Sequence, residues 1–126
     1  MVSLFTKIVD GELPCHKVYE DDDHLAFLDL RPISAGHTLL IPKKELDYLF
    51  DMPEEDYARM WGVARKIAAH LKSQTGCARV CVGVWGFEVP HAHIHLVPTD
   101  TMADFHWSGG SEASQDELAA MAAKLS

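Results

Sequence analysis

The stretch Val89-Pro90-His91-Ala92-His93-Ile94-His95-Leu96-Val97-Pro98 decides how this chain of 126 residues is interpreted. Its three histidines stand at alternate positions, and the residues between them are apolar. In a β-strand, residues i, i+2 and i+4 point to one face of the sheet. The spacing therefore predicts a strand that carries His91, His93 and His95 in a row, with the intervening apolar residues buried in a core behind them.

The composition is that of an ordinary globular protein, with 48% hydrophobic and 24% charged residues. A chain of this length suits one domain with a single core. The net charge of -8 disfavours binding to nucleic acid, because affinity for phosphate backbones comes from Lys and Arg. No stretch approaches the ~18 apolar residues of a membrane span.

The cysteines and the N-terminus indicate a cellular compartment. Cys15, Cys77 and Cys81 form no C-x-x-C motif and no disulfide framework. The first residues lack the long apolar stretch of a signal peptide. We therefore expect a cytoplasmic protein with no nucleic-acid and no membrane partner.

Hydrophobic periodicity predicts an α+β fold, in which an antiparallel sheet of about five strands is combined with one long helix and a short C-terminal helix. Met52-Pro53-Glu54-Glu55 opens the long helix, whose apolar positions recur at helical spacing up to Thr75, and Gly76 ends it. Ser114-Gln115-Asp116-Glu117 is a capping box. The expected strands are 17–20, 25–29, 37–42, 78–84 and the histidine strand; the expected helices are 5–9 (or a turn), 52–75 and 116–124.

Three interpretations of the histidine row are open from the residues alone. The first is an exposed strand that is rich in histidine by chance, although chance would not alternate so regularly with apolar residues. The second is a metal site, because zinc often takes two strand histidines and a third ligand from elsewhere. Successive residues on one face are ~6.5 Å apart, so the outer two histidines cannot easily share one ion. No nearby pattern of Cys, Asp or Glu completes such a site.

The third interpretation is nucleophilic catalysis at phosphorus. A neutral imidazole is a good nucleophile when one nitrogen donates to a fixed acceptor, such as a backbone carbonyl or a neighbouring ring. Flanking imidazoles that a nearby phosphate protonates would stabilise charge on its oxygens. In this scheme His93 attacks while His91 and His95 orient and stabilise, and no metal is needed.

The chain resembles the histidine triad (HIT) family, whose motif is His-φ-His-φ-His-φ-φ with φ hydrophobic. The run from His91 to Val97 fits this motif, and the likeness extends over residues 3–107. Further segments that resemble the family are 5–14, 18–22, 25–29 and 32–43, the last of which contains His37-Thr38-Leu39-Leu40-Ile41-Pro42-Lys43.

The resemblance implies hydrolases and transferases that act at the α-phosphate of a nucleotide through a covalent nucleotidyl-histidine intermediate. By position, His93 matches the nucleophile, and His95 matches the histidine that binds a phosphate oxygen. His91 matches the first triad histidine, which supports the nucleophile's surroundings. His37 matches an upstream histidine that helps to order the triad.

The resemblance also implies a nucleoside pocket. Asp29 matches a carboxylate that binds both ribose hydroxyls, and Leu30 follows it in the pocket. From the residues alone, Asp29 is equally well explained as a solvated loop acid. The apolar wall around the base would consist of residues that plain core packing explains at least as well: Phe5, Ile8, Phe27 and Leu39.

The loop before the triad departs from the family pattern. Many relatives have Gln followed by Ser or Thr there, as donors to the phosphate or the leaving group, whereas this chain has Phe87 and Glu88. Gly83 stands where relatives carry Asn. As a hypothesis, Glu88 is buried, stays protonated and donates a proton to the leaving group; the alternative is an exposed loop glutamate. Trp85 either shapes the rim of the site or simply packs.

Some bacterial relatives carry a structural zinc ion, which two N-terminal cysteines, a later histidine and the first triad histidine hold. The matching positions here are Ser3, Thr6, Glu45 and His91. Because three of the four ligands are replaced, we expect no metal, and the resemblance implies no other cofactor.

Members of the family are usually homodimers that pair through the long helix and adjacent strands. Tyr57, Met60 and Trp61 exceed what one side of a small sheet needs, which agrees with such a pairing. We therefore expect a homodimer.

These observations predict a HIT domain over residues 3–107, followed over 108–126 by a linker that contains Ser108-Gly109-Gly110-Ser111 and by the short C-terminal helix. The expected substrates are nucleotides, purine ones above all: adenosine phosphoramidates or similar adenylates first, dinucleoside polyphosphates next. A nucleotide-binding protein with little turnover is the competing interpretation, because losing one polar donor costs ~10²–10³ in rate. A zinc-binding module is the third.

Overall fold

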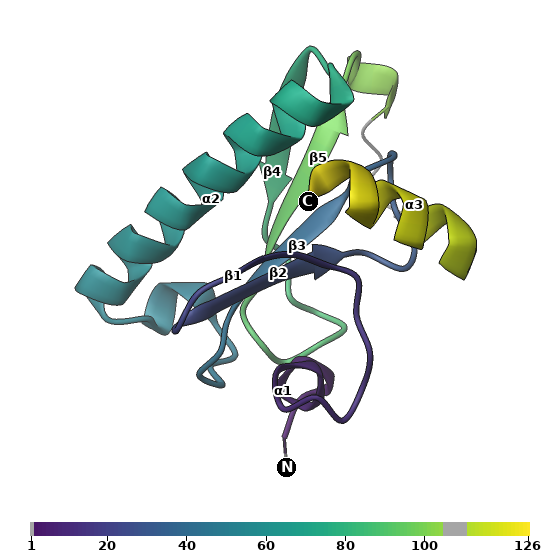
Figure 1. Ribbon diagram of the computed structural model, residues 1–126. Helices are drawn as coiled ribbons and strands as arrows, with labels where there is room; N and C mark the ends of the chain where they lie inside the picture. Colours follow the sequence, from purple (N-terminus) through teal and green to yellow (C-terminus); the bar gives the residue numbers. More distant parts are fainter. Residues whose placement is uncertain (1, 105–110) are drawn as a thin grey trace.

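Five antiparallel strands and three helices make up the part of the chain that the computed structural model describes, residues 2–104 and 111–126 (Figure 1). The elements are α1 (Leu4–Val9), β1 (Lys17–Glu20), β2 (His24–Leu28), β3 (Thr38–Pro42), α2 (Glu54–Thr75), β4 (Arg79–Gly83), β5 (Ile94–Thr99) and α3 (Gln115–Leu125). The strand order is β1-β2-β3-β5-β4, so the last strand in the sequence is inserted between β3 and β4. The α+β class predicted from the sequence is confirmed.

Most elements lie within two residues of their predicted bounds. The sequence does not predict two short 3-10 helices, Leu49–Asp51 and Met102–Asp104. Of the predicted linker, residues 108–110 lie outside the described part of the chain. The capping box at Ser114 is present, and α3 buries Leu118 and Leu125 in the same core as α2.

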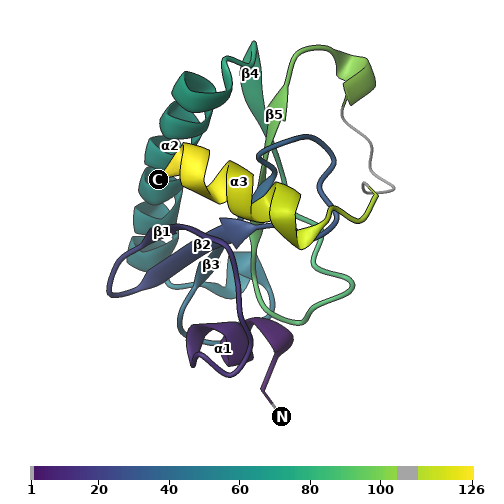
Figure 2. The ribbon, with the colours of Figure 1, turned by 45° about the vertical axis from the view of Figure 1, so that its right-hand side comes forward.

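The three central strands, β2, β3 and β5, are buried on both faces of the sheet, and the alternation of side chains along them assigns each residue to a face. On one face, residues of β2, β3 and β5 pack with α2 and α3 in the larger of two core clusters. On the other face, a smaller cluster consists of Phe5, Leu25, Phe27, Leu39 and Ile41. Figures 1 and 2 show α2 along one side of the sheet and α1 on the other.

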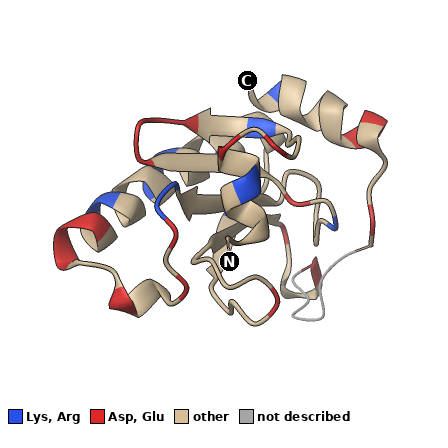
Figure 3. Cartoon of the chain, turned by 90° about the horizontal axis from the view of Figure 1, so that it is seen from below, with Lys and Arg blue, Asp and Glu red and all other residues tan. Residues whose placement is uncertain are grey.

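The long helix α2 follows the rules of helix ends. Pro53 precedes it, and its acidic first turn (red in Figure 3) complements the positive end of the helix dipole. It ends at Gly76, whose φ of 72° is a left-handed conformation that favours glycine.

Met60 is fully buried against the sheet of its own chain, so it does not add to an outer dimer face as its sequence position suggests. No described helix is long and apolar enough to cross a membrane.

The strand of the histidine row begins later than the spacing predicts. β5 starts at Ile94, so His95 lies in the sheet while His91 and His93 belong to the preceding loop. Pro42, at the end of β3, has no N–H with which to continue the pairing. Its carbonyl accepts a hydrogen bond from Nε2 of His91 over 2.8 Å. A side chain therefore satisfies the group that a longer strand would have paired.

Candidate active site

The residues expected at the site meet around a cavity of about 230 Å³ between α1, the ends of β2 and β3, and the loop before β5. His93 and His95 both line it. All seven residues predicted to bind substrate line it too: Phe5, Ile8, Phe27, Asp29, Leu30, Leu39 and Glu88. His37 and His91 do not belong to its lining. A larger cavity of about 400 Å³, beside Lys43 and Arg59, touches no triad histidine.

His93 has one ring nitrogen prepared as a nucleophile. Its Nδ1–H donates to the backbone carbonyl of His91 over 2.7 Å, which leaves the lone pair on Nε2. This is the acceptor that the phosphorus interpretation requires. Burial lowers the pKa of His93, so the ring is neutral at physiological pH. The edge of the Phe5 ring stands against it, with ring centroids 5.0 Å apart.

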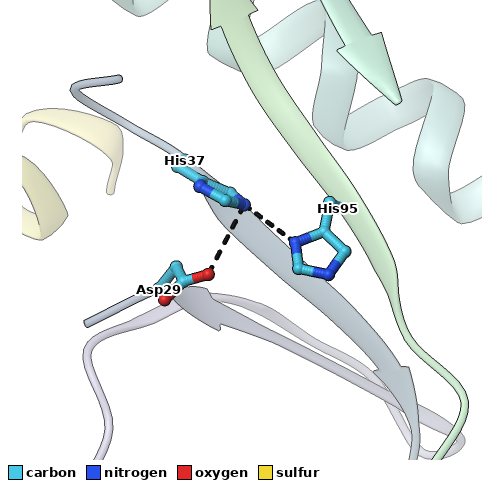
Figure 4. A group of neighbouring side chains, drawn as sticks. All are labelled: Asp29, His37 and His95. Atoms are coloured by element: carbon cyan, nitrogen blue, oxygen red, sulfur yellow. Dashed lines mark hydrogen bonds and ion pairs between the residues drawn. The ribbon is translucent and has the colours of Figure 1, made fainter. Parts of the chain in front are cut away.

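The tautomer of His95 follows from a chain of hydrogen bonds that begins in the main chain. The backbone N–H of Ile33 donates to Nδ1 of His37 over 3.0 Å, so the proton of His37 is on Nε2. That nitrogen is 3.0 Å from Nδ1 of His95 and 3.5 Å from Oδ2 of Asp29 (Figure 4). Nδ1 of His95 is therefore an acceptor, and Nε2 of His95 carries its proton.

This Nε2–H of His95 is a buried donor with no partner among the described residues. Burial, and then the neighbouring His93 and His37, lower the pKa of His95 to about 3, so the ring is neutral. A buried donor without an acceptor costs roughly 1–3 kcal/mol, and such groups often mark a ligand site. The flanking imidazole thus offers an N–H, not the full positive charge considered from the sequence.

His91 lies apart from the other two triad histidines. Its Nε2–H donates to Pro42, and its Nδ1 accepts the hydroxyl proton of Ser3 over 2.7 Å. The side chain is fully buried, and burial lowers its pKa. Both ring nitrogens are occupied within the protein, so His91 is placed to support its neighbours and not to contact a ligand.

Asp29 stands at the junction of this network and the cavity. Its Oδ1 accepts the backbone N–H of Arg31 over 2.9 Å, and its side chain is 22% exposed. The carboxylate is thus held in place and still open to a ligand. Leu30, beside it, is exposed at the rim.

Glu88 is exposed at the mouth of the cavity. The burial that would keep its carboxyl group protonated is absent, so the structure favours the alternative of an exposed loop glutamate. Phe87, at the position of the family's Gln, is 94% exposed and offers no polar donor from its side chain.

Two features of the site carry little or no signal in the sequence. The indole of Trp85 stacks on the imidazole of His95 and lines the cavity. Of the two alternatives for Trp85, the structure therefore favours a residue that shapes the site. The backbone N–H of Ile33 sets the tautomers of His37 and His95. Every residue but proline has such a group, so its role appears only when the loop is folded.

Comparison with known proteins shows the family. Residues 10–102 match the HIT domain, and the chain belongs to the HIT family. An uncharacterized HIT-like protein of Borreliella burgdorferi is 36% identical over 116 residues, which are 86% of this chain and 84% of that protein. Adenosine 5'-monophosphoramidase HNT1 of Saccharomyces cerevisiae is 35% identical over 96 residues, which are 75% of this chain and 61% of the relative.

Solved structures of the family have the same fold. A Hit-like protein from Bartonella henselae superposes with a TM-score of 0.86 at 30% identity, over 98% of this chain and 93% of that one. A Zn-bound histidine triad family protein from Mycobacterium smegmatis superposes with a TM-score of 0.81 at 29% identity, over 97% of this chain and 91% of that one.

The residues that match the family's zinc ligands do not suit zinc in this chain. Ser3, Thr6, Glu45 and His91 do lie together, joined by hydrogen bonds. Structural zinc sites are built from Cys and His, and two of these four residues offer only hydroxyl groups. Within the described residues, a cluster of possible ligands occurs instead at Asp29, His37 and His95. There Nε2–H of His37 donates to Nδ1 of His95, so these two nitrogens are already joined by a hydrogen bond.

Proposed function

We propose that this protein is a nucleotide hydrolase or transferase that acts at the α-phosphate through a nucleotidyl-His93 intermediate. One observation carries the proposal: two neighbouring imidazoles in the same cavity are prepared in opposite ways. His93 presents a lone pair on Nε2, and His95 holds a buried N–H that has no partner in the described part of the chain. Their ring centroids are 4.8 Å apart. A phosphoryl group fits this pair, because its phosphorus accepts a nucleophile and its oxygens accept a hydrogen bond.

In the proposed reaction, the base lies against the apolar wall and Asp29 accepts hydrogen bonds from the ribose hydroxyls. Nε2 of His93 attacks the α-phosphorus, and the bond from phosphorus to the leaving group breaks as that group takes up a proton from water. His95 donates its Nε2–H to a non-bridging oxygen, whose charge grows in the transition state. A water molecule then attacks the phosphorus, releases the nucleoside monophosphate and restores neutral His93.

The substrates that we propose are adenosine phosphoramidates or similar adenylates. The name of the yeast relative supports an amine leaving group, and a relative from Arabidopsis thaliana, 37% identical over 100 residues, is named Adenylylsulfatase HINT3. Dinucleoside polyphosphates are the second candidate class. The two classes share the nucleoside monophosphate part and differ in what His93 expels.

Turnover of adenosine 5'-phosphoramidate tests the proposal. The wild-type protein should release AMP and ammonia, and intact-mass analysis after rapid quenching should detect one adenylyl group bound to the chain. His93→Ala should lose roughly 10⁴–10⁶ in kcat, as expected when a covalent nucleophile is removed, and should form no adduct. Turnover that survives in His93→Ala refutes the role of His93.

The same experiment separates an enzyme from a binding protein. Because Phe87 and Glu88 replace polar donors, a protein that only binds nucleotide is the main competitor. Calorimetric titration with AMP should show binding in either case. Binding without turnover of any phosphoramidate or dinucleoside polyphosphate would leave only the binding function.

We also propose that the chain forms a homodimer through α2 and the edge of the sheet. β4 is an edge strand, and two valines are exposed there: Val82 on the strand and Val84 just after its end. An exposed edge with apolar side chains is a ready template for pairing with a second copy. Light scattering after size-exclusion chromatography measures the mass in solution, and a monomer at micromolar concentration contradicts this part of the proposal.

A further inference from the structure

We infer that Ser3 and Glu45 are positioning residues for the proposed reaction: they hold His91 in the one arrangement that orients the nucleophile, through a hydrogen-bonded network that is buried at Ser3 and His91 and exposed at Glu45. This inference rests on the proposed function of His93. It assigns a catalytic consequence to residues that touch neither the cavity nor a substrate.

The first link joins the start of the chain to the triad. Ser3 is the N-cap of α1, and its hydroxyl oxygen accepts the backbone N–H of Thr6 over 3.1 Å. The same hydroxyl donates its proton to Nδ1 of His91 over 2.7 Å, across 88 positions of the sequence. The Ser3 residue is 5% exposed and His91 is fully buried, so water does not compete for this bond.

The second link fixes Ser3 itself. Oε1 of Glu45, in the segment after β3, accepts the backbone N–H of Ser3 over 2.5 Å and the hydroxyl proton of Thr6 over 2.8 Å. One carboxylate oxygen therefore binds a residue at each end of the first turn of α1. Hydrogen bonds to a charged acceptor are roughly twice as strong as neutral ones, which suits Glu45 as the anchor of the network.

The third link reaches the nucleophile. Because Ser3 donates to Nδ1 and Pro42 accepts from Nε2, the ring of His91 is held at both nitrogens and in one tautomer. The carbonyl of the same residue accepts Nδ1–H of His93 over 2.7 Å. Because the ring and the carbonyl belong to one residue, a loosened ring lets the main chain of His91 shift. Such a shift of the carbonyl turns the ring of His93 away from the phosphorus. Displacements of about 1 Å can cost ~10² in rate.

A purely structural network would stabilise the fold without positioning His93, and this difference can be measured. The readout in the ligand-free protein is the Nδ1 proton of His93, whose chemical shift and exchange with water report its hydrogen bond to the carbonyl of His91. The variants are Ser3→Ala, which removes the donor, and Ser3→Thr, which keeps it. Ser73→Ala, on the exposed side of α2, is the matched control.

We expect Ser3→Ala to speed the exchange of the Nδ1 proton of His93 with water, and to lower kcat for adenosine 5'-phosphoramidate by about 10- to 100-fold with little change in KM. Ser3→Thr should restore both readouts, and Ser73→Ala should change neither. Glu45→Ala should repeat the effect, whereas Glu45→Gln, which keeps an acceptor oxygen, should be much milder. The Glu45 pair provides the test if Ser3→Ala does not fold.

Unchanged exchange of the His93 Nδ1 proton in Ser3→Ala and Glu45→Ala overturns the inference, and so does a loss of kcat that Ser3→Thr does not restore. The spectra need no turnover, so they separate this inference from the proposed function. Faster exchange of this proton in the variants of a protein that hydrolyses no nucleotide would uphold the positioning of His93 and refute the activity.

Discussion

The indole of Trp85 lies flat on the imidazole of His95, with ring centroids 3.8 Å apart and planes inclined by 17°. Gly83 makes room for this stack, because a Cβ at that position would stand 2.3 Å from the Trp85 ring. The glycine at the position of the family's Asn and the tryptophan two residues later therefore form one unit. This unit covers His95, whose Nε2–H has no acceptor among the described residues.

Replacing Trp85 should expose His95 and raise its pKa from about 3 toward the ordinary value of a histidine. We expect this rise in Trp85→Ala and, because the indole is displaced, in Gly83→Ala. Trp85→Phe keeps an aromatic cover and should shift the pKa less. Titration followed by NMR of the His95 ring measures the effect. An unchanged titration in Trp85→Ala would show that the indole does not shield the ring.

Asp29 should confer a preference for ribose over deoxyribose. A hydrogen bond to a charged group contributes about 1.5–3 kcal/mol, which corresponds to a preference of about 10- to 100-fold in kcat/KM for adenosine over 2'-deoxyadenosine phosphoramidate. Asp29→Asn should reduce the ratio of the two constants. The ratio is diagnostic because Asp29 also holds the loop through Arg31, and damage to that loop lowers both constants together. An unaltered ratio contradicts the assignment.

The buried histidines should make the protein less stable in mild acid. Burial lowers the pKa of His37, His91 and His93, and that of His95 to about 3. Unfolded histidines titrate near 6.5, so below that pH the unfolded state binds more protons and the free energy of unfolding falls as pH falls. The stability is complete above about pH 6.5 and is lost toward the folded pKa values, by up to about 1.4 kcal/mol per pH unit for each histidine.

Thermal unfolding between about pH 7 and pH 5 measures this loss, because ordinary carboxylates remain largely ionised there. His95→Asn removes one titrating group and should flatten the dependence of Tm on pH. A Tm that is constant over this range would contradict the neutral, buried state of the histidines.

Glu88→Gln should leave the pH–rate profile unchanged. The side chain of Glu88 is exposed at the mouth of the cavity, whereas the hypothesis of a proton donor requires it to be buried. Comparing the profiles of kcat for the wild type and the variant on an amine leaving group makes the test. A limb of the profile that disappears in Glu88→Gln would restore the hypothesis that this residue protonates the leaving group.

Protein purified without added metal should contain no stoichiometric zinc, because Ser3, Thr6 and Glu45 replace three ligands of the zinc-binding relatives. The triple variant Ser3→Cys, Thr6→Cys and Glu45→His should gain one zinc ion per chain, since His91 already lies among these residues. Elemental analysis of both proteins provides the comparison. One zinc per chain in the wild type would contradict this prediction.

Local sequence patterns were sufficient for most of the fold. Several of these patterns involve only a few neighbouring residues, so the sequence alone reveals them. They are the apolar run of β3, the helical period and acidic first turn of α2, its end at Gly76, and the capping box at Ser114. The start of β5 could not be read in this way. It depends on Pro42, a residue about fifty positions away that has no N–H to pair.

By itself, the sequence determined the α+β class and the family, because hydrophobic period and motif spacing are properties of neighbouring residues. The resemblance to that family, and not the period, implied many of the side chains that line the cavity. Only the tertiary structure decided which nitrogen of each imidazole carries the proton. Ile33 sets this for His37 and, through it, for His95, while the carbonyl of Pro42 sets it for His91. A tautomer is chosen by the partner that packing brings within about 3 Å, and no local pattern specifies that partner.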